Sequence, residues 1–146
     1  SGGLTICSMI GKGHRPNEAF FEDKGTRFKH VLSSLRKLAG SRGRFGFANP
    51  IFLAQKERGL QVKAVSHYIK GMGCYPPSVD PDSSAEQYFE ARAIKTSCAS
   101  LAVCAATIAN DGVCPLTNER CLRHEVVSNT IGEALLAALP RGNGLQ

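Results

Sequence analysis

A serine and a lysine stand one helical turn apart in the run Ser34-Leu35-Arg36-Lys37. On a helix, this S-x-x-K spacing brings an amine within reach of a hydroxyl, so that the lysine can accept the proton and activate the serine as a nucleophile. That chemistry requires a neutral lysine, which burial would have to provide. Here Arg36 lies beside Lys37 in a basic stretch, which favours the protonated amine. We therefore predict that Ser34 and Lys37 are exposed polar residues and not a catalytic pair.

The remaining reactive side chains do not form a catalytic or metal-binding set in the sequence. The histidines have no acid or second histidine at a ligand spacing, and the carboxylates of Glu57, Glu86 and Glu90 have no evident partner. Tyr88 lies in a helical pattern after a proline-rich segment, where packing with a hydrogen bond to the hydroxyl is the simplest expectation. The histidines are His14, His30, His67 and His124. The residues alone therefore predict no metal and no cofactor.

The sequence contains 6 cysteines, and no pair has the C-x-x-C spacing of a zinc or redox site. We favour reduced thiols in a reducing compartment over disulfides. This favours an intracellular location, cytoplasmic or mitochondrial. The cysteines are Cys7, Cys74, Cys98, Cys104, Cys114 and Cys121.

The net charge of +6 comes largely from one stretch, because no acidic residue occurs between Lys24 and Lys56. A basic stripe of this kind could follow the phosphates of a polyanion. However, the stretch has few aromatic residues to stack on bases, so a solvated helix face is the favoured interpretation and a nucleic-acid partner is not expected. No apolar run is long enough to cross a bilayer, so no membrane partner is expected.

The segment that would organise the surrounding structure is a helix over Ser97–Asn110, which is apolar or small almost all the way round. Such a helix is expected to be buried on every side. Thr96 or Ser97 can cap its start and Gly112 can end it. Pro115 then begins a stiff polar turn.

Helical patterns account for most of the rest of the chain. The segment Gly2–Ile10 is compatible with a helix or a strand, and Tyr75–Ser84 is too rich in proline to be helical. We expect Val126, Val127, Ile131, Leu135 and Leu136 to face inward on the last helix. The expected helices cover Glu18–Ala39, Asn49–Lys70 with a pause near Gly59, Ala85–Ile94 and His124–Leu139. The predicted fold class is mainly α, with little or no sheet in this chain.

Several ordered motifs resemble the serine-dependent glutaminases. The strongest is Ile108-Ala-Asn-Asp-Gly-Val-Cys-Pro-Leu-Thr117, followed by Glu119-Arg120. The matching motifs occur in the same order as in the family from about Gly2 to Thr130, and the resemblance cannot be followed beyond Ile131. Supporting matches are the helix before Ile108, Leu38–Gly40, Gly46–Asn49, Cys74-Tyr75-Pro76 and Gln87-Tyr88-Phe89.

This resemblance implies a β-lactamase-like α+β fold with a sheet-bearing part and a helical part, of which this chain is mainly the helical part. It divides the chain into an incomplete glutaminase-like helical region, 1–139, and a tail, 140–146. The family hydrolyses L-glutamine to L-glutamate and ammonia. The serine of an S-x-x-K motif attacks the side-chain amide, the lysine acts as base, and backbone N–H groups hold the oxyanion. The resemblance also implies a homo-oligomer in the complete protein.

The functional residues of the family transfer to this chain only in part. The nucleophile, its lysine and a substrate-binding asparagine would precede Ser1, and a further tyrosine would follow the chain. A substrate-contacting glutamate of the family corresponds to Gln55, and a second asparagine corresponds to Val62. Gln55 loses the charge that would face an α-ammonium group, and Val62 cannot hydrogen-bond through its side chain. Tyr88 alone matches a family active-site residue.

Two interpretations follow. The chain is an internal piece of a working glutaminase, or it belongs to a diverged, non-catalytic relative in which it serves packing or oligomer contacts. A polyanion-binding role for the basic stripe is a third, weaker interpretation. Under either of the first two, we expect no catalysis by the chain alone and expect it to expose apolar faces, which makes it marginally stable or prone to associate.

Overall fold

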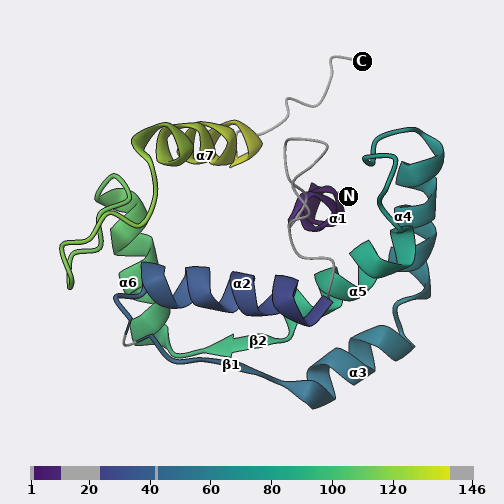
Figure 1. Cartoon of the computed structure of the whole chain (residues 1–146), viewed down its shortest axis with the longest axis horizontal. Helices are drawn as coiled ribbons and strands as arrows, with labels where there is room; N and C mark the ends of the chain where they lie inside the picture. Colours follow the sequence, from purple (N-terminus) through teal and green to yellow (C-terminus); the bar gives the residue numbers. More distant parts are fainter. Residues whose placement is uncertain (1, 11–23, 42, 139–146) are drawn as a thin grey trace, which may run out of the picture. The chain divides into compact units, whose positions relative to one another are not determined.

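The structure is a computed structural model of the whole chain, and we describe residues 2–10, 24–41 and 43–138 of it. The chain separates into two compact units. Unit 1 comprises Ser1–Ser34 and Phe45–Thr96, and unit 2 comprises Leu35–Arg44 and Ser97–Gln146. Helix α2 (Lys24–Leu38), labelled in Figure 1, contributes residues to both by its position in the chain, because the boundary between the units falls at Ser34 and Leu35. The predicted start of this helix at Glu18 and the tail 140–146 lie outside the described residues, so these two boundaries stay predictions.

In unit 1, three helices pack against α5 (Pro81–Arg92). Its partners are α1 (Gly2–Met9), α3 (Asn49–Glu57) and α4 (Leu60–Gly71). The segment that the sequence left open between helix and strand is therefore helical. The expected pause near Gly59 is confirmed as the break between α3 and α4.

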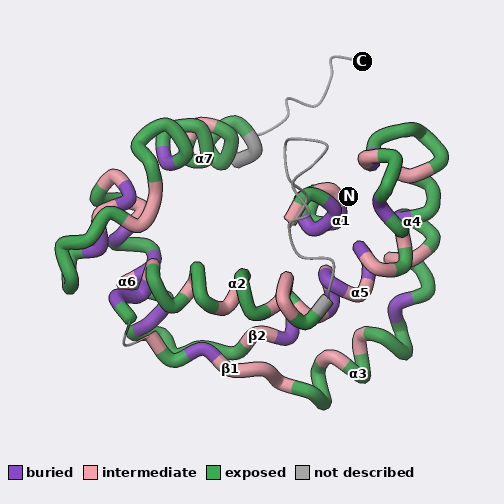
Figure 2. Tube along the Cα trace, viewed as in Figure 1, coloured by how far each residue is buried: buried purple, intermediate pink, exposed green. Residues whose placement is uncertain are grey.

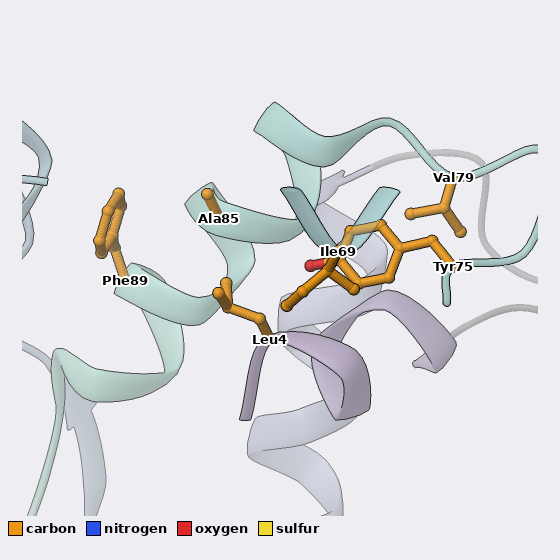
Figure 3. Packing of buried hydrophobic residues seen from close by; sticks show 6 residues of the cluster. All are labelled: Leu4, Ile69, Tyr75, Val79, Ala85 and Phe89. Atoms are coloured by element: carbon orange, nitrogen blue, oxygen red, sulfur yellow. The ribbon is translucent and has the colours of Figure 1, made fainter. Parts of the chain in front are cut away.

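The core of unit 1 is an apolar cluster contributed mainly by α1, α4 and α5 (Figure 3). The Tyr75 hydroxyl of this cluster has a partner, because it lies 2.9 Å from the Ser66 hydroxyl, which donates to the Pro81 carbonyl at 2.8 Å. Burial of this apolar surface is the main stabilising contribution available to the unit. The buried residues of the cluster are Leu4, Ile69, Tyr75, Val79, Ala85 and Phe89.

A small antiparallel sheet joins the two ends of the Phe45–Thr96 segment of unit 1. Strand β1 (Phe45–Phe47) pairs with β2 (Ile94–Thr96), in a register that places Gly46 opposite Lys95. The Ala48 N–H donates to the Ala93 carbonyl at 2.9 Å and extends the pairing. The mainly helical fold class with little sheet is confirmed.

The start of α5 corrects one prediction. We expected Tyr75–Ser84 to be non-helical, but α5 begins at Pro81. Asp80 is the N-cap, and its carboxylate accepts a bond from the Ser83 N–H at 2.8 Å. A proline is favourable in the first turn of a helix, where its missing N–H is not needed, so the proline that suggested a loop instead opens the helix.

Unit 2 contains the end of α2 together with α6 (Cys98–Ala109) and α7 (His124–Ala138). The predicted Ser97 cap is confirmed, since its hydroxyl accepts from the Ser100 N–H at 3.2 Å. The expectation that the central helix is buried all round is wrong: α6 buries only Ser100, Cys104 and Thr107 among its residues (Figure 2). Leu101 on the same helix, for example, is 59% exposed.

Helix α7 departs from the prediction in the same way. Val127 is buried, but Leu135 and Leu136 are each 64% exposed. Val126 and Ile131 are also exposed, and most of α7 has the colour of exposed residues in Figure 2. The sequence pattern correctly predicted a helix, but an apolar face is buried only where another element lies against it.

Candidate functional site

The structure places Tyr88 and Val62 around one pocket, which lies within unit 1 and has a volume of about 260 Å³. It opens among three helices, because α1, α4 and α5 each contribute lining residues. The described lining residues are Gly3, Leu4, Gln61, Val62, Val65 and Tyr88. Two of the three site residues predicted from the sequence are thus brought together.

The third predicted site residue, Gln55, is not among the described residues that line this pocket. It lies half-buried on α3, and its backbone carbonyl faces the α3–α4 junction. A Cβ added at Gly59 would lie 2.7 Å from that carbonyl and 2.3 Å from Cζ of Phe89. A glycine is therefore required for the close contact at this junction, and a substrate-binding role for Gln55 stays a prediction.

Helix α1 approaches Tyr88 through a glycine. A Cβ built on Gly3 would lie 2.9 Å from Cε2 of the Tyr88 ring, so a larger residue there would displace the ring. Gly3, Leu4 and Val65 carry no sequence signal that marks them as parts of a site. Val62 and Val65 are three positions apart on α4 and therefore share a face, but nothing in the sequence indicates that α1 completes the wall.

Tyr88 is fixed by Arg92, one turn later on α5. The Arg92 Nη1 donates to the tyrosine hydroxyl oxygen at 3.3 Å, and the guanidinium lies 5.6 Å from the ring centroid, within the range of a cation–π contact. The expectation that this hydroxyl finds a partner is confirmed. Because Arg92 supplies a hydrogen to the oxygen, the hydroxyl keeps its own hydrogen to donate elsewhere.

The pocket offers little to a charged ligand. Among its described lining residues, only the Gln61 amide and the Tyr88 hydroxyl are polar side-chain groups, and none is a carboxylate, ammonium or guanidinium. An ammonium or carboxylate group placed here would lose water without gaining an opposite charge, which is unfavourable. The lining residues by themselves suit a neutral group with one or two hydrogen-bonding atoms.

A comparison with protein families identifies the fold. The family model described as glutaminase matches residues 1–137. The chain belongs to the glutaminase family. It is 38% identical over 109 residues to the mitochondrial liver isoform of glutaminase from Rattus norvegicus, and this match covers 75% of the chain and 18% of the relative. It is 37% identical over 123 residues to putative glutaminase 2 of Caenorhabditis elegans, covering 84% of the chain and 19% of the relative.

Solved glutaminase structures share the fold. A probable glutaminase from Bacillus subtilis superposes with a TM-score of 0.73 at 22% identity, covering 92% of this chain and 38% of that one. The same organism's glutaminase in covalent complex with 5-oxo-L-norleucine gives a TM-score of 0.72 at 21% identity, covering 87% and 39%. The chain therefore spans only part of the length of a glutaminase, both in sequence and in structure.

The S-x-x-K motif is not part of the pocket of this glutaminase-family chain. Ser34 and Lys37 are both exposed on α2, as predicted, and neither is among the described lining residues. Within the described ranges, no group of three or more histidine, cysteine, aspartate or glutamate residues could hold a metal ion. No described helix is both long and apolar enough to cross a membrane.

A second polar cluster lies between α2 and α5 within unit 1. Arg27 belongs to the basic stretch that was expected to be a solvated face. It instead donates from Nη2 to the Ser83 hydroxyl at 2.9 Å and from Nη1 to the Gln87 amide oxygen at 3.4 Å. Its Nε and the Gln87 Nε2 are buried without a hydrogen-bond partner. Arg27 thus anchors α2 to α5 and is not available as a free surface cation.

Proposed function

We propose that this chain supplies the helical side of a glutaminase-type site. In this proposal, the longer protein hydrolyses L-glutamine to L-glutamate and ammonia through a serine acyl-enzyme, and the chain alone is inactive. The observation that carries the proposal is the position of Tyr88, the residue that matches the family motif, in a pocket with its hydroxyl oriented by Arg92. Family membership over residues 1–137 supports the reaction class.

The chain's own contribution would be to position the substrate. The Tyr88 hydroxyl can donate a hydrogen bond to an oxygen of the bound molecule, and the valine and leucine side chains can exclude water from around it. The described lining residues include neither a serine nor a lysine, so the nucleophile and its base would have to come from another part of the protein. This is the physical reason to expect no turnover by the chain alone.

Oligomerisation and location belong to the same proposal. Large apolar side chains on α3 and α4 are exposed, including Leu60 at 77% and Tyr68 at 68%, which is consistent with packing against further protein. Self-association into a homo-oligomer in the complete protein is one form of that packing. An intracellular location, cytoplasmic or mitochondrial, is supported by the relative from Rattus norvegicus, which is named as mitochondrial.

The proposal is tested by measuring ammonia released from L-glutamine by the purified chain and by the product of the complete parent transcript. We expect release by the parent protein and none by the chain above a heat-treated control. A parent protein that folds but releases no ammonia would contradict the hydrolytic part of the proposal. Ammonia release by the chain alone would contradict the part of the proposal in which the nucleophile comes from another part of the protein.

A second candidate function is favoured by the lining of the pocket. Val62 occupies the position where the family resemblance implies an asparagine, and the described lining carries no charge to pair with the α-ammonium or α-carboxylate of glutamine. In this second proposal the chain belongs to a diverged, non-catalytic member of the family that serves packing or oligomer contacts.

A titration of the parent protein with L-glutamine separates the two candidates. The catalytic candidate predicts saturable binding by the natural protein. The non-catalytic candidate predicts none up to millimolar concentrations, with binding gained in the double variant Gln55→Glu, Val62→Asn because it restores a carboxylate and an amide. The conservative variant Val62→Ile serves as the matched control, since it leaves the pocket without the new polar groups.

A further inference from the structure

Three cysteine side chains of unit 2 converge on the end of α2. Cys104 Sγ lies 3.7 Å from the Leu35 carbonyl oxygen, and Cys121 Sγ lies 3.3 Å from the Lys37 carbonyl oxygen. Cys114 Sγ lies 3.1 Å from the position that a Cβ would occupy on Gly40. All three thiols are free. Cys104 lies on α6, and Cys114 and Cys121 lie on the hairpin that follows it, which is formed around the bridge between Val113 and Arg120.

Two of these cysteines are neighbours across that hairpin. Val113 and Arg120 form an antiparallel bridge. The Cys114 N–H donates to the Glu119 carbonyl at 2.9 Å, and the Cys121 N–H donates to the Gly112 carbonyl at 2.7 Å. Because side chains alternate along paired strands, Cys114 and Cys121 lie on the same face of the bridge as diagonal neighbours.

The surroundings of the three thiols distinguish them chemically. The Thr117 hydroxyl, together with the N–H groups of Thr117 and Leu116, lowers the pKa of Cys114 to about 7, which favours its thiolate. Burial raises the pKa of Cys104 and keeps it protonated. Cys121 is partly exposed, so a reagent from solution can reach it, whereas Cys114 is enclosed.

We propose that Cys121 and Cys114 form an oxidisable pair that a low-molecular-weight disulfide converts to an intramolecular disulfide. The Cys121 thiolate attacks one sulfur of oxidised glutathione and releases one glutathione thiolate. The Cys114 thiolate then attacks the Cys121 sulfur of the mixed disulfide and releases the second. Two protein thiols are oxidised to one disulfide and the glutathione disulfide is reduced to two thiols, so the two protons that the protein thiols lose end, through solvent, on the two glutathione sulfurs.

The hairpin can make the small movement that this bond needs. Diagonal neighbours on paired strands have Cα atoms about 7–8 Å apart, slightly beyond the usual span of a disulfide of roughly 4.4–6.8 Å. Residues 115–120 are exposed, so the tip can shift without disturbing a packed core. Closing the bond would move Cys121 away from the Lys37 carbonyl and make the contact between hairpin and α2 dependent on redox state.

Trypsin gives a direct readout, because cleavage after Arg120 and Arg123 isolates Cys121 in the peptide 121–123 while Cys98, Cys104 and Cys114 fall together in 96–120. The experiment uses the full chain with the exposed Cys74 and Cys98 both replaced by serine, treated with oxidised glutathione at low protein concentration and digested without reduction. We expect the two peptides to be joined, and dithiothreitol to separate them.

Three variants in that background test the assignment. In Cys104→Ser the joined peptides persist, and in Cys114→Ser they are lost and Cys121 carries glutathione instead. In Cys121→Ser, which leaves the enclosed residues intact, Cys114 remains unmodified. Joined peptides that disappear in Cys104→Ser but persist in Cys114→Ser would overturn the pairing. If the chain with both Cys114 and Cys121 present forms only the glutathione adduct, the proposed disulfide is overturned. Circular dichroism of each variant verifies that it is folded.

Discussion

The two units bury their interiors with different chemistry. Unit 1 packs large apolar side chains such as Leu4, Ile69 and Phe89 in one cluster. In unit 2 the buried positions of α6 are Ser100, Cys104 and Thr107, and two of them bond to carbonyls of α2. A helix leaves its last carbonyls without intrahelical donors, so the Thr107 hydroxyl can satisfy the carbonyl of Leu38, whereas the Leu35 carbonyl also accepts from the Ala39 N–H at 3.0 Å. The stability of unit 1 is therefore expected to depend mainly on the volume of its buried apolar side chains, and the stability of unit 2 mainly on its buried hydrogen bonds.

The largest expected effect comes from removing volume in unit 1. Phe89 is only 2% exposed, and truncation in the variant Phe89→Ala should lower the free energy of unfolding by about 3–5 kcal/mol through lost burial and the cavity left behind. Urea denaturation measures the change. Leu101→Ala is the control, because Leu101 is 59% exposed. A loss in Phe89→Ala no larger than in the control would contradict the role of the cluster.

A smaller loss is expected from removing one hydrogen bond in unit 2. The Thr107 hydroxyl donates to the Leu38 carbonyl at 2.8 Å and is fully buried. Thr107→Val keeps the shape but leaves that carbonyl without this donor, at a cost of about 1–3 kcal/mol in unfolding free energy. Thr107→Ser, which keeps the hydroxyl, should recover part of the loss. A larger loss in Thr107→Ser than in Thr107→Val would show that the methyl group of this side chain contributes more than its hydrogen bond.

The pocket of unit 1 should respond to a single methyl group. Gly3→Ala places a Cβ within 2.9 Å of the Tyr88 ring, so the ring must move and the pocket narrow. We expect a modest loss of stability, about 1 kcal/mol, with altered chemical shifts of the Tyr88 ring in an NMR spectrum. Gly2→Ala is the matched control, since a Cβ there meets no atom within 4 Å. Unchanged Tyr88 shifts in Gly3→Ala would contradict the close approach of α1.

The smallest expected effect concerns pH and the start of α7 in unit 2. His124 Nδ1 lies 2.5 Å from Asp111 Oδ1, and this hydrogen bond lowers the pKa of the Asp111 carboxyl, with smaller contributions from Arg120. A lowered folded-state pKa stabilises the protein above the ordinary carboxyl range, and that stabilisation is lost as the pH falls through the folded value. Denaturation midpoints at pH 7 and pH 3 should therefore differ more in the natural chain than in Asp111→Asn. Asparagine tolerates the positive φ of this position, 55°, so the backbone is preserved.

The sequence predicted the helices well because their signals are local. Ser97 as an N-cap and Gly112 with its positive φ each act within a few residues. The predicted start of α5 was wrong because an Asp-Pro pair such as Asp80 and Pro81 can mark either a loop or a helix N-terminus. The strands β1 and β2 were missed because each has only three residues and depends on a partner far along the chain.

Burial was predicted less well than helicity. The patterns of α6 and α7 correctly gave helices, but exposed side chains such as Leu101 and Leu135 show that an apolar face does not specify its partner. The candidate site was predicted in part through the family resemblance, which pointed to Tyr88 and Val62. The contribution of Gly3 and the orientation of Tyr88 by Arg92 depend on how α1 and α5 pack, which no local pattern in the sequence encodes.

The most direct test of the central claim, that this glutaminase-family chain holds a substrate-positioning pocket without catalytic groups, is a steady-state assay of ammonia release from L-glutamine by the purified chain. We predict release equal to that of a heat-treated sample, and identical traces for the natural chain and for Tyr88→Phe. Sustained release by the natural chain that falls in Tyr88→Phe would contradict the account, because the pocket would then carry out the reaction with groups that its described lining does not contain.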